Sequence, residues 1–133
     1  MGLEGATVMG PKPQLTRVFV NLINNAVQAI ENAQAEAGER GGEAFIGRIV
    51  ISLRLSTKEG FYDIVFEDNG PGVSDDNRAR LFTPNFTTKS NGTGLGLSIC
   101  RNILEKCDAE IFYSKSFALK GACFTVRFPR KRS

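Results

Sequence analysis

The chain has 133 residues, of which 41% are hydrophobic and 23% charged, and its formal net charge is +3. This length is typical of one domain that buries its own core, and the composition is that of a globular rather than a disordered protein. The mild charge and the scattered basic residues argue against a nucleic-acid partner, and no apolar run is long enough to span a bilayer.

Two residue types limit the chemistry. The chain has no histidine, so it cannot itself supply a catalytic or phosphorylated histidine. Its three cysteines, Cys100, Cys107 and Cys123, are an odd number without metal-type spacing, which favours reduced thiols. No secretory leader is visible. The sequence predicts a cytoplasmic domain, and it leaves open whether the full-length protein is anchored in a membrane.

The first half of the chain contains one long helical pattern between strand patterns. Residues 3–9 are typical of a short edge strand. From Gln14 the apolar residues recur at helical spacing and predict a helix to about Ala37, after which glycines end it. Residues 48–56 alternate between apolar and polar types, and residues 61–67 form a second strand pattern. The turn between them predicts an antiparallel hairpin.

The second half of the chain contains a loop, a helical pattern and two further strand patterns. Residues 73–93 are irregular and polar, with a short helix expected near 75–81, and an amphipathic helix begins at about Leu95. Two strands, 109–114 and 122–128, close the chain around a turn at Lys120-Gly121. The pattern predicts one α+β domain over residues 1–133, with helices on one face of a mixed, mostly antiparallel sheet.

A polar stripe runs along the first predicted helix. Asn21, Asn25 and Gln28 fall at i, i+4 and i+7, on one side of the helix. Asparagine is a mediocre helix former, because its amide competes for backbone hydrogen bonds. The simplest interpretation is the polar edge of a solvated helix. The functional alternative is that the amide oxygens, which are hard ligands, approach a divalent cation such as Mg²⁺.

A glycine-rich turn follows the second strand of the hairpin. Asp68, Asn69, Gly70, Pro71 and Gly72 have common turn chemistry, and a plain turn is one interpretation. A carboxylate at the end of a strand can also accept a hydrogen bond from an exocyclic amine, while glycines let a flat base approach the backbone.

A second glycine-rich stretch precedes the last predicted helix. Gly92, Gly94 and Gly96 flank Thr93 and Leu95, and the exposed amides of a helix N-terminus favour an anion. A flexible loop is the alternative. The stretch lacks the Gly-Lys-Ser/Thr of a P-loop, and it is not the dinucleotide fingerprint, because a long loop rather than a strand precedes it.

Taken in order, these motifs resemble the ATP-binding catalytic domain of sensor histidine kinases, in the superfamily of gyrase, heat-shock chaperone, histidine kinase and mismatch-repair ATPases. The resemblance covers nearly the whole chain. Residues 21–26 match the N box, 68–72 the first glycine box, 82–89 the F box and 92–97 the second glycine box. The Thr87-Thr88-Lys89 ending of the F box looks most like the nitrogen-regulatory type of sensor kinase.

The resemblance implies a Bergerat-type two-layer sandwich, with ATP and Mg²⁺ as cofactors. It implies Asn25 as the main Mg²⁺ ligand with support from Asn21, Asp68 as acceptor for the adenine amino group, and residues 73–93 as a lid that brings Lys89 to the terminal phosphate. Asn21 and Lys89 are the implied catalytic residues. The implied nucleotide-binding residues are Asn21, Asn25, Asp68, Gly70, Gly72, Lys89, Thr93, Gly94, Leu95, Gly96 and Leu97.

One position separates a kinase from a hydrolase. ATP hydrolases of the superfamily typically carry a glutamate where this chain has Asn21, and an amide cannot act as a general base. The resemblance therefore implies transfer of the phosphoryl group, with weak hydrolysis, to a histidine on a dimerisation domain of the same full-length kinase, and from there to a response regulator. We expect the isolated domain to be monomeric.

The chain departs from the family pattern at two places. Residues 11–13 replace an acidic residue that often precedes the first helix, and Gln28 replaces a basic residue. Three alternatives remain: an anti-sigma-factor-type serine kinase, which usually keeps the glutamate; a clamp ATPase of the chaperone or gyrase kind, which also needs a transducer domain; and a nucleotide-binding scaffold without catalysis.

Overall fold

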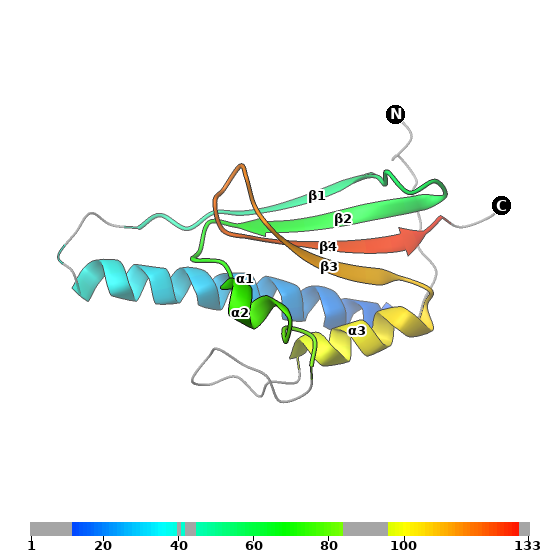
Figure 1. Cartoon of the computed structure of the whole chain (residues 1–133), viewed down its shortest axis with the longest axis horizontal. Helices are drawn as coiled ribbons and strands as arrows, with labels where there is room; N and C mark the ends of the chain where they lie inside the picture. Colours follow the sequence, from blue (N-terminus) through cyan, green and yellow to red (C-terminus); the bar gives the residue numbers. More distant parts are fainter. Residues whose placement is uncertain (1–11, 40, 42–44, 84–95, 131–133) are drawn as a thin grey trace.

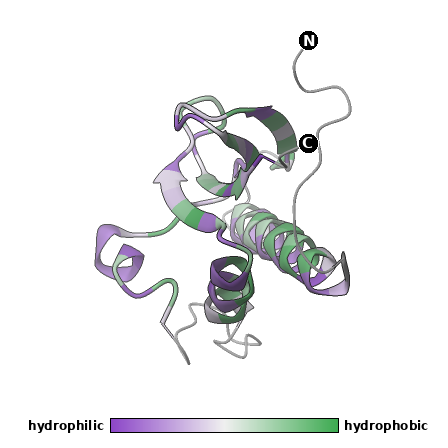
Figure 2. Cartoon of the chain, turned by 90° about the vertical axis from the view of Figure 1, so that its right-hand side faces the viewer, coloured by the Kyte–Doolittle hydropathy of each residue, from purple (hydrophilic) through white to green (hydrophobic). Residues whose placement is uncertain are grey.

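The computed structural model describes residues 12–39, 41, 45–83 and 96–130. The helices lie together on one side of a sheet and form a two-layer α+β arrangement (Figures 1 and 2). The elements in chain order are α1 (Lys12–Glu39), β1 (Ile49–Leu55), β2 (Phe61–Asp68), α2 (Asp75–Arg78), α3 (Gly96–Lys106), β3 (Glu110–Lys115) and β4 (Ala122–Pro129). Among the described helices, none has both the length and the apolar character needed to cross a membrane.

The sheet has four strands in the order β1-β2-β4-β3. The predicted hairpin is confirmed, since β1 pairs with β2 in antiparallel register, with Leu55 opposite Tyr62. β2 and β4 are antiparallel, and so are β3 and β4. The α+β class is therefore confirmed. The described strands form antiparallel pairs only, where a mixed sheet was expected, and the predicted edge strand at residues 3–9 lies outside the described residues.

Most predicted element bounds differ from the structure by one or two residues. α1 includes Gly38 and ends at Glu39 rather than at Ala37. α2 is shorter than expected and ends at Arg78, although turns continue the chain to Leu81. Ser74 caps this short helix, because its hydroxyl accepts a hydrogen bond from Asn77 N.

One hydrophobic core joins the two layers. Val18 and Leu22 of α1 are almost completely buried, at 0% and 1% exposure, and Phe128 of the sheet is also fully buried. The Phe19 ring lies 6.0 Å from the Phe66 ring and 6.2 Å from the Phe128 ring, so α1 packs on β2 and β4 through aromatic contacts. The end-on view in Figure 2 shows hydrophobic residues on the faces where helices and sheet meet.

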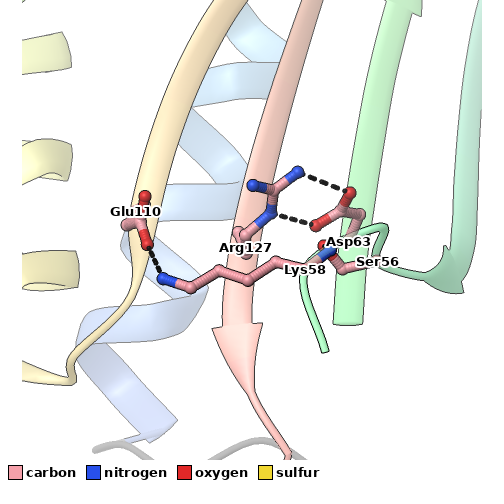
Figure 3. Close-up of polar contacts among 5 residues, drawn as sticks. All are labelled: Ser56, Lys58, Asp63, Glu110 and Arg127. Carbon is pink, nitrogen blue, oxygen red and sulfur yellow. Dashed lines mark hydrogen bonds and ion pairs between the residues drawn. The ribbon is translucent and has the colours of Figure 1, made fainter. Parts of the chain in front are cut away.

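The outer face of the sheet carries two ion pairs (Figure 3). Arg127 donates from Nε to Asp63 Oδ1 at 2.9 Å and from Nη2 to Asp63 Oδ2 at 3.2 Å, which joins β4 to β2. The hydrogen bond to Asp63 raises the pKa of Arg127 above its usual value. Lys58 Nζ contacts Glu110 Oε1 at 2.8 Å near the end of the β1–β2 hairpin.

Candidate functional site

The candidate site begins at the C-terminal end of β2. The side chain there belongs to Asp68, which is 4% exposed. Its Oδ1 accepts hydrogen bonds from Gly70 N at 2.9 Å and from Ala122 N at 3.4 Å. The turn that follows β2 and the first residue of β4 therefore fix the orientation of this carboxylate. A buried carboxylate in a defined orientation suits recognition of a hydrogen-bond donor.

Three glycines let the backbone close around Asp68. Gly72 has a φ of +77°, in the region that favours glycine. A Cβ on Gly70 would lie 3.0 Å from the Ala29 Cβ, so this turn packs against α1. A Cβ on Gly121 would overlap the Asp68 carbonyl oxygen. Gly121 was predicted only as part of a hairpin turn, and its role beside Asp68 was missed.

Asn69 has a structural task at this turn. Its Nδ2 donates to Ile46 O at 2.9 Å, and its Oδ1 accepts from Arg48 N at 2.8 Å. The amide therefore ties the turn to the segment that leads into β1. This contact explains an asparagine between Asp68 and Gly70 without any ligand.

Asn21 contacts α3. Its side chain is half-buried, and its Nδ2 donates to Cys100 Sγ at 3.6 Å. The Cys100 thiol in turn donates to Val18 O at 3.9 Å. Burial raises the pKa of Cys100, so the sulfur keeps the proton that this second contact requires. Because Nδ2 points at the sulfur, the Asn21 carbonyl oxygen, which can only accept, is the atom that remains for a metal.

The asparagine stripe connects α3 to the glycine turn. Asn21, Asn25 and Ala29 follow one another at four-residue steps, so they share one side of α1 over about 12 Å. The first contacts α3 through Cys100, and the last lies against Gly70. Half-buried Asn25 therefore lies between the two contacts. This places the predicted metal ligand between the predicted base site and the contact with Cys100 of α3.

The donor set fits Mg²⁺ and an adenine nucleotide. Amide oxygens are hard ligands of the kind that Mg²⁺ accepts, usually together with phosphate oxygens and water. Within the described ranges, no group of three or more His, Cys, Asp or Glu side chains could hold a metal ion. The described asparagines Asn21 and Asn25 would therefore supply amide oxygens to a metal that the nucleotide also binds.

The second glycine box is described only in part. Gly96 is the first residue of α3, and apart from its chain neighbours and its own helix, no atom of the described residues lies within 4 Å of the position that a Cβ would take. Leu97 is half-buried and packs against the core. The predicted site residues Lys89, Thr93, Gly94 and Leu95 lie outside the described residues, as does Gly92.

The structure adds Tyr113 to the surroundings of the site. Its hydroxyl accepts a hydrogen bond from Val73 N at 2.9 Å, directly after the glycine turn. From the sequence, this residue is predicted only as part of a strand. An aliphatic side chain could fill this half-buried strand position. The hydroxyl of the tyrosine is therefore the local feature that indicates a hydrogen bond here.

Comparisons with known proteins identify the family of this chain. The family model described as histidine kinase-, DNA gyrase B- and HSP90-like ATPase matches residues 10–132. Sensor histidine kinase ZraS of Escherichia coli (strain K12) is 37% identical over 116 residues, which are 87% of this chain and 22% of that protein. Sporulation kinase C of Bacillus subtilis (strain 168) is 31% identical over 128 residues, 96% of this chain and 26% of that protein. The chain thus spans about a quarter or less of these relatives.

Solved structures show the same architecture. The catalytic domain of histidine kinase ThkA, in a nucleotide-free form, superposes with a TM-score of 0.71 at 27% identity, over 92% of this chain and 70% of that chain. Full-length ShkA in complex with AMPPNP also has a TM-score of 0.71, at 23% identity, over 96% of this chain and 24% of that chain. The chain therefore belongs to the family of histidine kinase-, DNA gyrase B- and HSP90-like ATPases, and within it to the catalytic domains of sensor histidine kinases.

Proposed function

We propose that this chain binds Mg-ATP and donates its terminal phosphoryl group to a histidine on a separate dimerisation domain of the same full-length kinase, in two-component signalling. The observation that carries the proposal is the buried Asp68 carboxylate, held in a glycine turn that packs on the asparagine-bearing helix. This arrangement offers one acceptor for a base and amide oxygens for a metal.

Different residues bind the base, the metal and the phosphates of the nucleotide. Asp68 accepts a hydrogen bond from the adenine amino group, while the backbone of the turn at Gly70 and Gly72 lies close to the flat ring. The carbonyl oxygens of Asn25 and Asn21 hold Mg²⁺. Residues 89–97, with Lys89 and the second glycine box, hold the phosphates at the start of α3. When bound, Mg-ATP supplies the phosphoryl group, and the surrounding residues mainly position it and neutralise its charge.

The acceptor lies outside this chain, which contains no histidine. The relatives named above are longer than this chain, as a kinase with a further phosphoacceptor domain would be. Full-length ShkA, which contains this fold, was solved in complex with AMPPNP, an analogue of the proposed nucleotide. We propose that the phosphoryl group then passes from the histidine to a response regulator.

Calorimetric titration of this chain with ATP, or with a non-hydrolysable analogue, in the presence of Mg²⁺ tests the proposal. We expect saturable binding by the unaltered chain. Asp68→Asn keeps an oxygen for the Gly70 and Ala122 N–H groups but loses the negative charge. It should therefore weaken binding more than tenfold, as expected for a hydrogen bond to a charged group.

Asp63→Asn is the matched control. Asp63 is as buried as Asp68, at 4% exposure, but it lies on the outer face of the sheet against Arg127. Its replacement should lower stability and leave the affinity for ATP unchanged. A folded unaltered chain that binds no nucleotide would overturn the proposed function.

A further inference from the structure

We propose that Tyr113 is a positioning residue, whose hydroxyl holds Gly72 and Val73 in the conformation that receives the nucleobase. The inference rests on the proposed function, because it concerns the same nucleotide site. It assigns to β3 a task in ligand binding that neither the glycine box nor the asparagine helix supplies.

The phenol meets the turn at two adjacent residues. Val73 N donates to Tyr113 Oη at 2.9 Å, and the contact is partly buried. A Cβ added to Gly72 would lie 3.4 Å from the same oxygen, so the hydroxyl packs against the glycine as well. Gly72 holds a φ of +77° there. The hydroxyl therefore braces the turn where its backbone is most unusual.

The phenol ring is itself in contact with two side chains. Tyr113 belongs to β3, and its ring packs edge-on against Phe124 of β4, with centroids 5.2 Å apart. The Arg78 guanidinium of α2 lies 5.2 Å from the centroid of the same ring. Tyr113 therefore contacts both the turn and the short helix that follows it. The position of the hydroxyl is fixed before any ligand arrives.

Removal of the hydroxyl should change the conformation of the turn, and through it the affinity for the ligand. Val73 N–H would lose its partner, and the turn would populate conformations that cannot receive a base. Apparent affinity falls in proportion to the fraction of molecules that remain competent. The loss of affinity arises at the turn that binds the base. It should therefore not depend on Mg²⁺ or on the number of phosphates.

The chain supplies a matched pair of variants, since it has two tyrosines, Tyr113 and Tyr62. Tyr62 is also in the sheet, opposite Leu55 and Phe128, and it packs against Arg130. Tyr113→Phe and Tyr62→Phe each remove one hydroxyl and keep the ring packing. Both are titrated calorimetrically with Mg-ATP and with metal-free ADP, at a temperature where circular dichroism shows each variant folded.

We expect Tyr113→Phe to weaken the binding of both nucleotides by about three- to tenfold, the range of one neutral hydrogen bond. Tyr62→Phe should bind as the unaltered chain does. Unchanged affinity in Tyr113→Phe, or a loss confined to Mg-ATP, would overturn the inference. Absence of binding by the unaltered chain would instead refute the proposed function.

Amide hydrogen exchange in the nucleotide-free chain provides a readout that does not need the ligand. The Val73 amide should exchange faster in Tyr113→Phe than in the unaltered chain, and at an unchanged rate in Tyr62→Phe. Equal exchange at Val73 in all three proteins would show that the hydroxyl does not hold the turn.

Discussion

The Asn21 side chain has two polar atoms with different surroundings. Nδ2 is directed at the Cys100 sulfur, which fixes which end of the amide faces α3. A glutamate at this position could not make that contact, because a carboxylate has no N–H to donate. The asparagine is therefore matched to the cysteine opposite it, and an amide rather than a carboxylate stands at this position.

This residue leads to a prediction about hydrolysis. We expect the isolated chain to release inorganic phosphate from Mg-ATP at a negligible rate, because an amide cannot activate water at neutral pH. A continuous phosphate-release assay checks this, under conditions where calorimetry shows the nucleotide bound. Sustained turnover that Asp68→Asn abolishes would contradict the role assigned to Asn21.

The residues of the site differ in how well they can be predicted from the sequence. Asp68 stands in a local motif with its glycines, so the sequence could predict its place. The partners of the site could not be predicted, because they are distant in sequence. Cys100 is 79 residues from Asn21, and Tyr113 is 40 residues from Val73. No local pattern encodes such contacts.

At the level of the elements, β2 and β4 are joined by backbone pairing and by the Asp63–Arg127 ion pair. Asp63 lies opposite Arg127 in the antiparallel register, and its side chain is 5% exposed, against 20% for Arg127. Both oxygens of the carboxylate take part in the contact. A buried bidentate pair of this kind becomes costly when only one partner is removed.

We expect Arg127→Met to destabilise the chain by about 3 kcal/mol or more, because it leaves the buried Asp63 carboxylate without its cation. Adding Asp63→Leu should recover much of the loss. Urea unfolding of the two single variants and the double variant measures the coupling. Glu110→Gln is the control, since it breaks the exposed pair with Lys58 and should cost about 1 kcal/mol or less. Equal losses in Arg127→Met and Glu110→Gln would contradict this account.

The elements could be predicted from the sequence, but the order of the strands in the sheet could not. Alternation predicted β1, the other described strands were predicted from their strand patterns, and the hairpin turn gave the β1–β2 pairing. The pairing of β4 with β2 joins segments that are distant in sequence, so periodicity alone does not give it. The overextended prediction for α2 has a local reason, because Leu81 closes a turn to Arg78 O that continues the helical pattern without a helix.

At the level of the whole molecule, the two layers share one core. The buried cluster contains Leu15, Val18 and Leu22 of α1, residues of α3 such as Leu104, and sheet residues such as Phe128. The site depends on this union, because α1 supplies the asparagines while β2 supplies Asp68. A change that separates the layers should therefore unfold both together.

Leu22→Ala tests this cooperativity. Leu22 is 1% exposed in the shared core, so its truncation should cost about 2–5 kcal/mol. Val20→Ala, on the same helix at 47% exposure, should cost about 0.5 kcal/mol or less. Both tyrosines are in the sheet and the chain has no tryptophan, so tyrosine fluorescence reports the sheet while far-UV circular dichroism reports mainly the helices.

In urea, the two signals of Leu22→Ala should change at one common midpoint, shifted below that of the unaltered chain, as expected for a single cooperative unit. The common midpoint follows from the core, because neither layer retains a buried face once the other is lost. Separate midpoints, with the helical signal lost first, would show that the sheet is stable without α1. In that case Asp68 and the asparagines would belong to independently folding parts of the chain.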